Sequence, residues 1–163
     1  MQVRAAQQED LDEIMRVVDT ARAFMRAHGN RQQWINGYPS RALYAEDIAG
    51  GHCFVITEHE TVHAVFSLFT GDDPTYAVIE DGAWLDQEPY ACIHRIGSDG
   101  VLRGTLQAAV DFALTVCPEL RADTHADNAV MQNALRKCGF IRCGIIYVAD
   151  GSPRVAFERP ARG

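Results

Sequence analysis

The chain has 163 residues, of which 47% are hydrophobic and 23% are charged, and its net charge is -7. This length and composition are typical of one globular domain, and we predict a single domain over residues 1–163. The acidic balance argues against a nucleic-acid partner, because binding to phosphates needs a basic surface. No apolar run is long enough to cross a bilayer and the N-terminus lacks a signal-peptide pattern, so we expect a cytoplasmic protein without a membrane partner.

The cysteines are odd in number, and no two of them form a CxxC pair. They lie mostly within apolar runs, which predicts buried free thiols that pack as small hydrophobic residues. Cys92 lies two residues before His94, a spacing that would suit a catalytic thiol with a neighbouring base. A strand produces the same spacing because alternate side chains share a face, and we favour this structural explanation.

Hydrophobic periodicity predicts a strand, two helices and a hairpin in the first half of the chain. Residues 2–5 are typical of a short strand, and apolar residues recur at helical spacing over residues 9–28. A second helix is expected over residues 40–49, where glycines follow its last turn. The β-rich runs at 52–58 and 62–71 are separated by a short polar turn and predict an antiparallel hairpin.

The second half of the chain begins with a strand over residues 89–96. Its alternation predicts one face with Tyr90, Cys92, His94 and Ile96, and another with Ala91, Ile93 and Arg95. After it we expect, in order, a glycine loop over 97–105, a helix to 116, a strand over 120–125, a helix capped by Asp127 or Asn128 that ends at Gly139, and a hairpin of 140–148 with 154–159. The element order is therefore βααβββαβαββ.

This order resembles the GNAT superfamily of acyltransferases over essentially the whole chain. The resemblance rests on GSDGVLRGT after a central strand and on LRKCGF before the last hairpin. More narrowly, WINGYP, PTYAVIEDGAWL, IHRI, DTHADNAVMQ and GIIYVADGSPR resemble a bacterial GNAT subgroup. The resemblance implies an α/β (α+β) fold with a central mixed, mostly antiparallel twisted sheet of about seven strands and helices on both faces.

The function that the resemblance implies is acyl-CoA-dependent N-acetylation. The cosubstrate would be acetyl-CoA, with no metal, and the acceptor a primary amine of a small molecule, less readily a protein N-terminus or lysine. The alternative is a catalytically weak acyl-CoA sensor, because Val101 and Leu106 replace the basic and small residues of the family's loop pattern. The sequence leaves open whether the protein forms a homodimer.

The glycine loop has a physical use that does not depend on the family. A loop that leads into a helix N-terminus points free backbone N–H groups and the helix dipole at an anion such as a pyrophosphate. An ordinary βα turn that uses glycine for its backbone angles is an equally good explanation of the loop alone. With the resemblance, the residues that would bind the cosubstrate are Ile96, Gly97, Ser98, Gly100, Arg103, Gly104, Thr105 and Asn128.

His94 is the leading candidate for a general base, because imidazole titrates near neutral pH and the resemblance places this strand beside the thioester. A half-buried histidine with a purely structural hydrogen bond carries equal weight. Asp123 and His125 share one face of the neighbouring strand and would orient the substrate or ionise with His94. In the structural alternative, the DTHADN segment only caps a helix and Asp123 pairs with Arg95 or Arg121.

The tyrosine that serves many relatives as an acid is replaced by Leu135. Tyr147 or Tyr76 would have to substitute, unless the thiolate leaves without help. An aromatic pocket with polar anchors is expected for the acceptor, formed by Trp34, Tyr38, Tyr76, Trp84, Arg95 and Asp123. At least half of these aromatic residues are expected simply to fill core space. A metal site is rejected, because His59 and His63 lie at a hairpin turn rather than on a helix.

Overall fold

The computed structural model describes residues 1–161 and is organised around a seven-stranded sheet in the order β1-β2-β3-β4-β5-β7-β6. Only β4 and β5 are parallel, and every other neighbouring pair is antiparallel. The expected mixed, mostly antiparallel sheet is confirmed, and so is the element order. The strands are β1 Gln2–Ala5, β2 Cys53–Glu58, β3 Thr61–Thr70, β4 Ala91–Ser98, β5 Leu120–Thr124, β6 Ile141–Tyr147 and β7 Pro153–Arg159.

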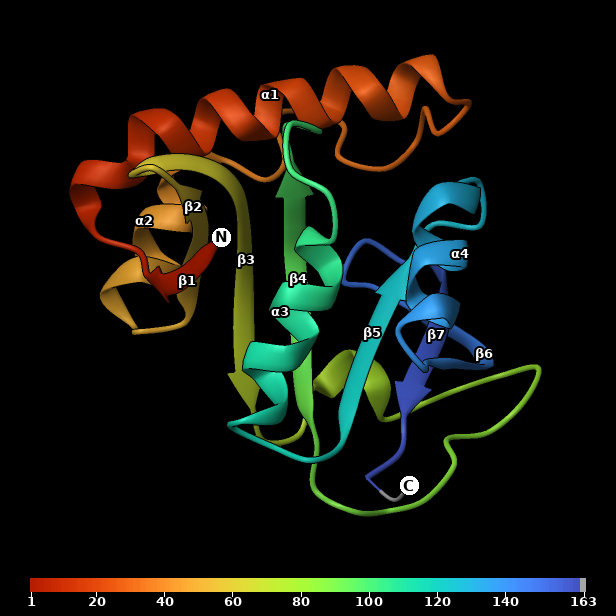
Figure 1. The fold of residues 1–163 in the computed structure, drawn as a ribbon. Coiled ribbons are helices and arrows are strands. Elements are labelled where there is room, and N and C mark those ends of the chain that lie inside the picture. The colour runs from red at the N-terminus through yellow and green to blue at the C-terminus, as the bar shows by residue number, and fades with distance from the viewer. Residues whose placement is uncertain (162–163) are drawn as a thin grey trace.

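Helices cover both faces of this sheet, as expected. The helices α3 and α4 lie in front of the sheet in Figure 1, whereas α1 crosses the end of β4. One core cluster packs α3 and α4 against the strands, and a second packs α1 and α2 against the opposite face. Within the described residues, no helix has the length and apolar character needed to cross a membrane. The helices are α1 Leu11–Ala27, α2 Arg41–Ala49, α3 Thr105–Leu114 and α4 Ala129–Lys137, with short 3-10 turns at η1 Gln8–Asp10 and η2 Pro74–Tyr76.

The strands β4 and β5 pair only at their beginnings. Ala91 lies opposite Leu120 and Cys92 opposite Arg121, and no later residue of β4 pairs with β5. The strands then separate, as Figure 1 shows. Beyond Cys92 the side chains of both strands line a cavity instead of continuing the sheet.

A β-bulge at Arg95 changes the face to which the end of β4 points. Arg95 has a φ of 52°, in the left-handed region that non-glycine residues rarely adopt. The pairing with β3 places His94 opposite Ser67 and Gly97 opposite Val65. Two residues of β4, Arg95 and Ile96, therefore lie opposite the single residue of β3 between these pairs. The predicted alternation is therefore wrong at Ile96, which packs in the same core cluster as Ile93 rather than with Cys92.

A buried acidic cluster lies where β5 and β7 reach the loop before β4. The Glu119 and Glu158 side chains are 1% and 0% exposed, and their oxygens lie within 4.8 Å of those of Asp86. Arg121 Nε donates to Glu158 at 2.8 Å, which stabilises the ionised form of Glu158. Burial, followed by hydrogen bonds with Glu158 and Asp86, raises the pKa of Glu119 to about 8.

We predict that Glu119 makes the stability of the protein fall between about pH 5 and pH 8. The folded state binds the proton of the Glu119 carboxyl more tightly than the unfolded state does. The contribution of this proton to the free energy of unfolding is therefore complete below the unfolded pKa and is lost as the pH rises through about 8. Urea unfolding across this range should show a smaller pH dependence for Glu119→Gln, which keeps a neutral side chain. The matched control is Glu46→Gln on an exposed position of α2, and equal slopes for wild type and Glu119→Gln would contradict the prediction.

Candidate functional site

A large cavity, of about 680 Å³, lies where β4 and β5 separate. Its walls come from β4, β5, the loop after β3, the start of α4, the turn between β6 and β7, and the loop after α1. A second cavity of about 260 Å³ lies between α1, the end of β4 and the starts of α3 and α4. Both are lined by Ile96, Leu106 and Asn128. The cavities therefore adjoin, and together they lead from the α3 N-terminus to the middle of the sheet.

The N-terminus of α3 differs from those of α2 and α4. Ser40 accepts from the Leu43 amide at the start of α2, and Asn128 accepts from the Met131 amide at the start of α4. Asn128 rather than Asp127 is thus the cap. At α3 the capping position is Gly104, with a φ of 76° and no side-chain oxygen to accept from the first turn. The positive end of this helix is available to an anion.

The loop before α3 uses several of its own amides internally. The Gly100 amide donates to Ser98 Oγ and the Val101 amide to Asp99 Oδ1. These two amides are already used and cannot donate to a ligand. Fewer backbone N–H groups are therefore left for an anion than the sequence predicts. Of the expected cosubstrate residues, Arg103 and Gly104 line neither cavity, whereas Ile96, Gly97, Ser98, Gly100, Thr105 and Asn128 all line the second.

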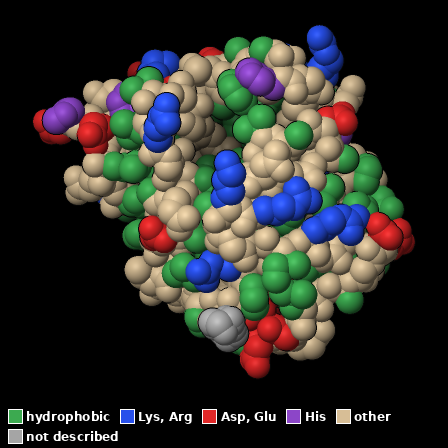
Figure 2. Space-filling model, turned by 45° about the vertical axis from the view of Figure 1, so that its right-hand side comes forward, with side chains coloured by type: hydrophobic (Ala, Val, Ile, Leu, Met, Phe, Trp, Pro, Cys, Tyr) green, Lys and Arg blue, Asp and Glu red, His purple; other side chains and the backbone are tan. Residues whose placement is uncertain are grey.

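Basic side chains are not spread evenly over this acidic protein. Figure 2 brings the right-hand side of Figure 1 forward and shows Lys and Arg side chains gathered beside and below a hollow. A local positive potential of this kind attracts anionic ligands even when the net charge is negative.

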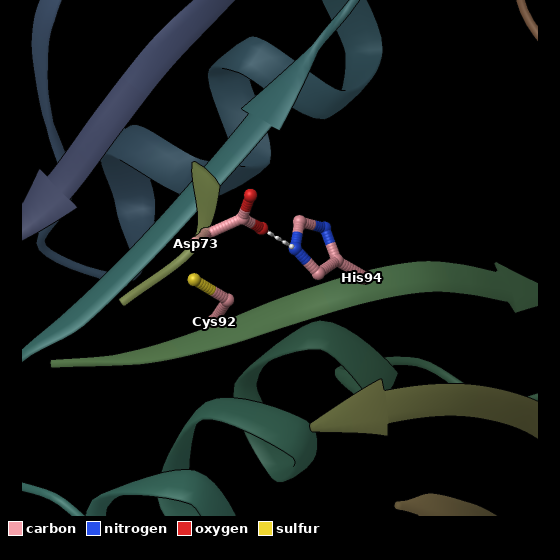
Figure 3. A group of neighbouring side chains, drawn as sticks. All are labelled: Asp73, Cys92 and His94. Atoms are coloured by element: carbon pink, nitrogen blue, oxygen red, sulfur yellow. Dashed lines mark hydrogen bonds and ion pairs between the residues drawn. The ribbon is translucent and has the colours of Figure 1, made fainter. Parts of the chain in front are cut away.

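His94 is held on one side by Asp73, from the loop after β3. His94 Nε2 and Asp73 Oδ2 are 2.8 Å apart, as the dashed line in Figure 3 marks. The other oxygen of Asp73 accepts from the amide and hydroxyl of Thr75, and the Asp73 amide donates to the Tyr90 hydroxyl. The hydrogen bond with His94 is the main cause that lowers the pKa of Asp73 to about 2. Because Asp73 is an ionised acceptor, Nε2 carries a proton, and in a neutral imidazole Nδ1 then has the free lone pair.

The other ring nitrogen of His94 faces Asp123 across a short gap. Nδ1 lies 4.0 Å from Asp123 Oδ2, too far for a hydrogen bond. Asp123 Oδ2 accepts from the Tyr76 hydroxyl at 2.7 Å. Burial, and then the Asp123 charge, raises the pKa of Tyr76 well above its usual value, so Tyr76 stays a donor. Two acceptors, Nδ1 and Oδ2, therefore face each other, and a ligand nitrogen that lies to the side of the gap would be able to donate to both.

Cys92 lies beside Asp73 and His94, as Figure 3 shows. One potential ligand atom from each of these residues lies within 4.8 Å of the others, so the group has the composition of a metal site. Burial, and then the Asp73 and Asp123 charges, raises the pKa of Cys92, which favours a thiol over the thiolate that metals and nucleophilic catalysis need. His94 Nε2 is also occupied by Asp73. The donor set fits a metal poorly, and the absence of a metal stays a prediction.

The expected aromatic pocket is formed only in part. Trp34, Tyr38 and Arg95 line the large cavity. Tyr76 is 2% exposed and lies behind Asp123 instead of at the wall. Trp84 lines neither cavity, because its Nε1 donates to the Tyr76 carbonyl and the Arg121 guanidinium lies 4.0 Å from its ring centre.

The structure does not bring Tyr147 or His125 to the cavity wall. Tyr147 is 42% exposed and its hydroxyl donates to Glu80. His125 lies one residue beyond β5, where its Nδ1 accepts from the Asp127 amide. Burial and then the charge of Arg154 lower the pKa of His125. His125 is therefore used in a turn, and neither residue is positioned to serve as the acid or base that the sequence suggested.

The structural alternative, in which Asp123 pairs with Arg95 or Arg121, is not what the structure shows. Arg95 forms its ion pair with Asp47, and Arg121 pairs with Glu158. Both arginines are bound by carboxylates from other elements, which leaves Asp123 to Tyr76.

Sequence reasoning missed Asp73, Gln33 and Arg154, which all line the large cavity. The segment Asp73-Pro74-Thr75 carries a capping pattern that predicts a turn, but nothing in it indicates His94, which lies 21 residues later. Gln33 Oε1 accepts from Asn128 Nδ2 at 3.2 Å and so joins the loop after α1 to the start of α4. Such contacts between distant segments have no periodic signal in a single sequence.

We predict that Asp73 fixes the tautomer of His94. Long-range ¹H–¹⁵N spectra at about pH 8, where an ordinary histidine is neutral, should show a protonated Nε2 and an unprotonated Nδ1. Asp73→Asn removes the ionised acceptor and should increase the population of the Nδ1–H tautomer. The control is Asp72→Asn, an exposed neighbour. An unchanged tautomer in Asp73→Asn would show that the hydrogen bond does not select it.

Comparison with known proteins finds one family throughout. The model of the acetyltransferase (GNAT) domain matches residues 1–141. A GNAT-family acetyltransferase from Streptococcus agalactiae is 31% identical, with 99% of this chain and 96% of that chain covered and a TM-score of 0.89. None of the curated proteins matches the chain.

Two more distant structures share the fold. The ribosomal-protein-S18-alanine N-acetyltransferase of Escherichia coli is 14% identical, with 99% and 94% of the two chains covered and a TM-score of 0.63. A GNAT-like decarboxylase in complex with isobutyryl-CoA is 14% identical, with 99% and 100% covered and a TM-score of 0.65.

Proposed function

The chain belongs to the GNAT acetyltransferases, and we propose that it transfers the acetyl group of acetyl-CoA to the primary amine of a small molecule, with His94 as the general base. The observation that carries the proposal is the gap between His94 Nδ1 and Asp123 Oδ2. Both atoms accept hydrogen bonds, and an ammonium group donates in several directions at once. The gap is therefore suited to the acceptor nitrogen.

The cosubstrate fits the two adjoining cavities. The uncapped N-terminus of α3 would bind the pyrophosphate of coenzyme A. The pantetheine arm would pass Ile96 and Leu106, which line both cavities, into the opening between β4 and β5. The thioester would then lie near His94, which lines the large cavity. The complex of a distant fold relative with isobutyryl-CoA agrees with this class of ligand.

The proton bonded to Nε2 determines how His94 would work. The acceptor ammonium gives one proton to the free lone pair of Nδ1, and the neutral amine attacks the carbonyl carbon of the thioester. The C–N bond forms and the C–S bond breaks. The second proton of the nitrogen reaches the departing thiolate through solvent, and His94 releases its proton to water. Asp73 stabilises the imidazolium, which accounts for a carboxylate at Nε2.

No protein acid is needed for the departing group. Leu135 lines the cavity at the position of the family's tyrosine, Tyr147 lies outside, and the Tyr76 proton is used by Asp123. A thiolate is a good leaving group because thiols ionise at only slightly alkaline pH. The step relies instead on positioning by the two cavities.

An acyl-CoA sensor is the second candidate function. It is favoured by Val101 and Leu106 in the loop and by the internal use of the Gly100 and Val101 amides, which weaken the anion site. A sensor would bind coenzyme A without releasing thiol from acetyl-CoA in the presence of amines. The half-buried Asp73–His94 pair has no evident use in a sensor, and for this reason we favour the enzyme.

We predict that His94→Gln lowers kcat about 100-fold or more, the usual contribution of a general base. Affinity for acetyl-CoA should stay within about twofold, because the anion site at α3 is separate from His94. Steady-state thiol release gives the first quantity and calorimetry the second. If the variant keeps the wild-type rate over the whole pH range, His94 is not the base.

At Gly104 we predict the opposite pattern, in which the affinity for coenzyme A falls. Gly104→Glu places a negative charge at the N-terminus of α3 and should weaken coenzyme A binding about tenfold or more. Gly104→Asn is the matched control, because asparagine tolerates a positive φ without adding charge. Equal affinity of the Glu and Asn variants would remove α3 from the anion site.

A further inference from the structure

Arg154, near the start of β7, is a cation of the large cavity that no carboxylate neutralises directly. Its Nη1 donates to Ser152 Oγ at 3.1 Å and to the Pro153 carbonyl at 2.8 Å. Among residues 1–161, no acidic side chain forms an ion pair with it, whereas Arg95 in the same cavity is paired with Asp47. Two donors of Nη2 and one of Nε remain for a ligand.

The sheet places Arg154 on the same face as Asp123. Asp123 lies opposite Ala156 in the pairing of β5 with β7. Arg154 precedes Ala156 by two residues and lies opposite Ile146, and both of these apolar side chains belong to the core cluster around Tyr76. Two strand residues span about 7 Å. The guanidinium is thus within side-chain reach of a small molecule whose amine lies between His94 and Asp123.

We infer that the acceptor carries a carboxylate as well as its amine, as a free amino acid does. This inference rests on the proposed function and specifies its substrate class. The ammonium donates to both His94 Nδ1 and Asp123 Oδ2 from beside the gap, and the carboxylate binds the unused donors of Arg154. Arginine presents parallel N–H groups that match the two oxygens of a carboxylate.

The other charges of the cavity favour this assignment over a polyamine. Asp73 is taken by His94, Asp123 is assigned to the ammonium of the acceptor, and Asp150 accepts from the amide and hydroxyl of Ser152. The remaining carboxylate of the wall, Asp72, is exposed, so a second ammonium would pair only with this solvent-exposed group, and near Arg154 it would be repelled. Asp150 reaches the half-buried guanidinium only indirectly, through the Ser152 hydroxyl, and a ligand carboxylate would supply a direct counterion.

The test compares ligands that differ only in the carboxylate. The probes are the common amino acids, their C-terminal amides and putrescine, each titrated calorimetrically into protein saturated with coenzyme A and then assayed for thiol release with acetyl-CoA. We expect at least one amino acid to bind about ten- to a hundredfold more tightly than its amide. In Arg154→Gln this preference should vanish because the affinity for the amino acid falls while that for the amide is unchanged.

Arg142→Gln is the matched control, because Arg142 pairs with Asp81 at the surface and lines neither cavity. It should keep the preference for the amino acid. Equal binding of amides, tighter binding of putrescine, or no binding of any amino acid would each overturn the inference. Binding with the expected preference but no thiol release would overturn the proposed enzyme and leave the ligand class standing.

Discussion

The buried ion pair between Asp47 and Arg95 is the constraint on which the site depends. Asp47, on α2, receives both Nε and Nη2 of Arg95 at 2.9 and 3.0 Å and also the Ser67 hydroxyl. The Tyr44 hydroxyl donates to the carbonyl of Arg95. A left-handed conformation costs a non-glycine residue about 1–2 kcal/mol, and breaking a buried pair costs about 3–5 kcal/mol. These contacts therefore hold the bulge in β4.

The bulge separates the chemistry of the site from the binding of its cosubstrate. Before it, His94 faces Asp73 and Asp123 on one side of the sheet. After it, Ile96 turns toward the α3 core and lines the second cavity. In a regular strand His94 and Ile96 would share a face. Under the proposed function, the irregular residue would thus let one strand contact both the amine and the arm of coenzyme A.

Periodicity was enough to predict the order of the elements, because burial imposes regular spacing on every helix and strand. The two-sided cover of the sheet was implied by the family resemblance. The same rule failed at Arg95, since a bulge inserts a residue that the period of two does not contain. His94 was identified from its strand and its chemistry. Asp73 and Arg154 were missed because they reach the cavity through tertiary contacts between distant segments, and Tyr147 was misplaced because its hydrogen bond to Glu80 turns it outward.

The polarity of the cavity changes along its length, and this change would place the two reactants of the proposed reaction at different ends. The α3 end offers a helix N-terminus without a capping side chain, which attracts the phosphates of coenzyme A despite the net charge of -7. At the sheet end the carboxylates of Asp73 and Asp123 flank His94 and attract an ammonium. Under the proposed function, an anionic cosubstrate and a cationic acceptor would thus be drawn to opposite ends. Arg154 lines the large cavity but not the one at the α3 N-terminus, so in the proposed assignment it would select among amines without competing for the cosubstrate's phosphates.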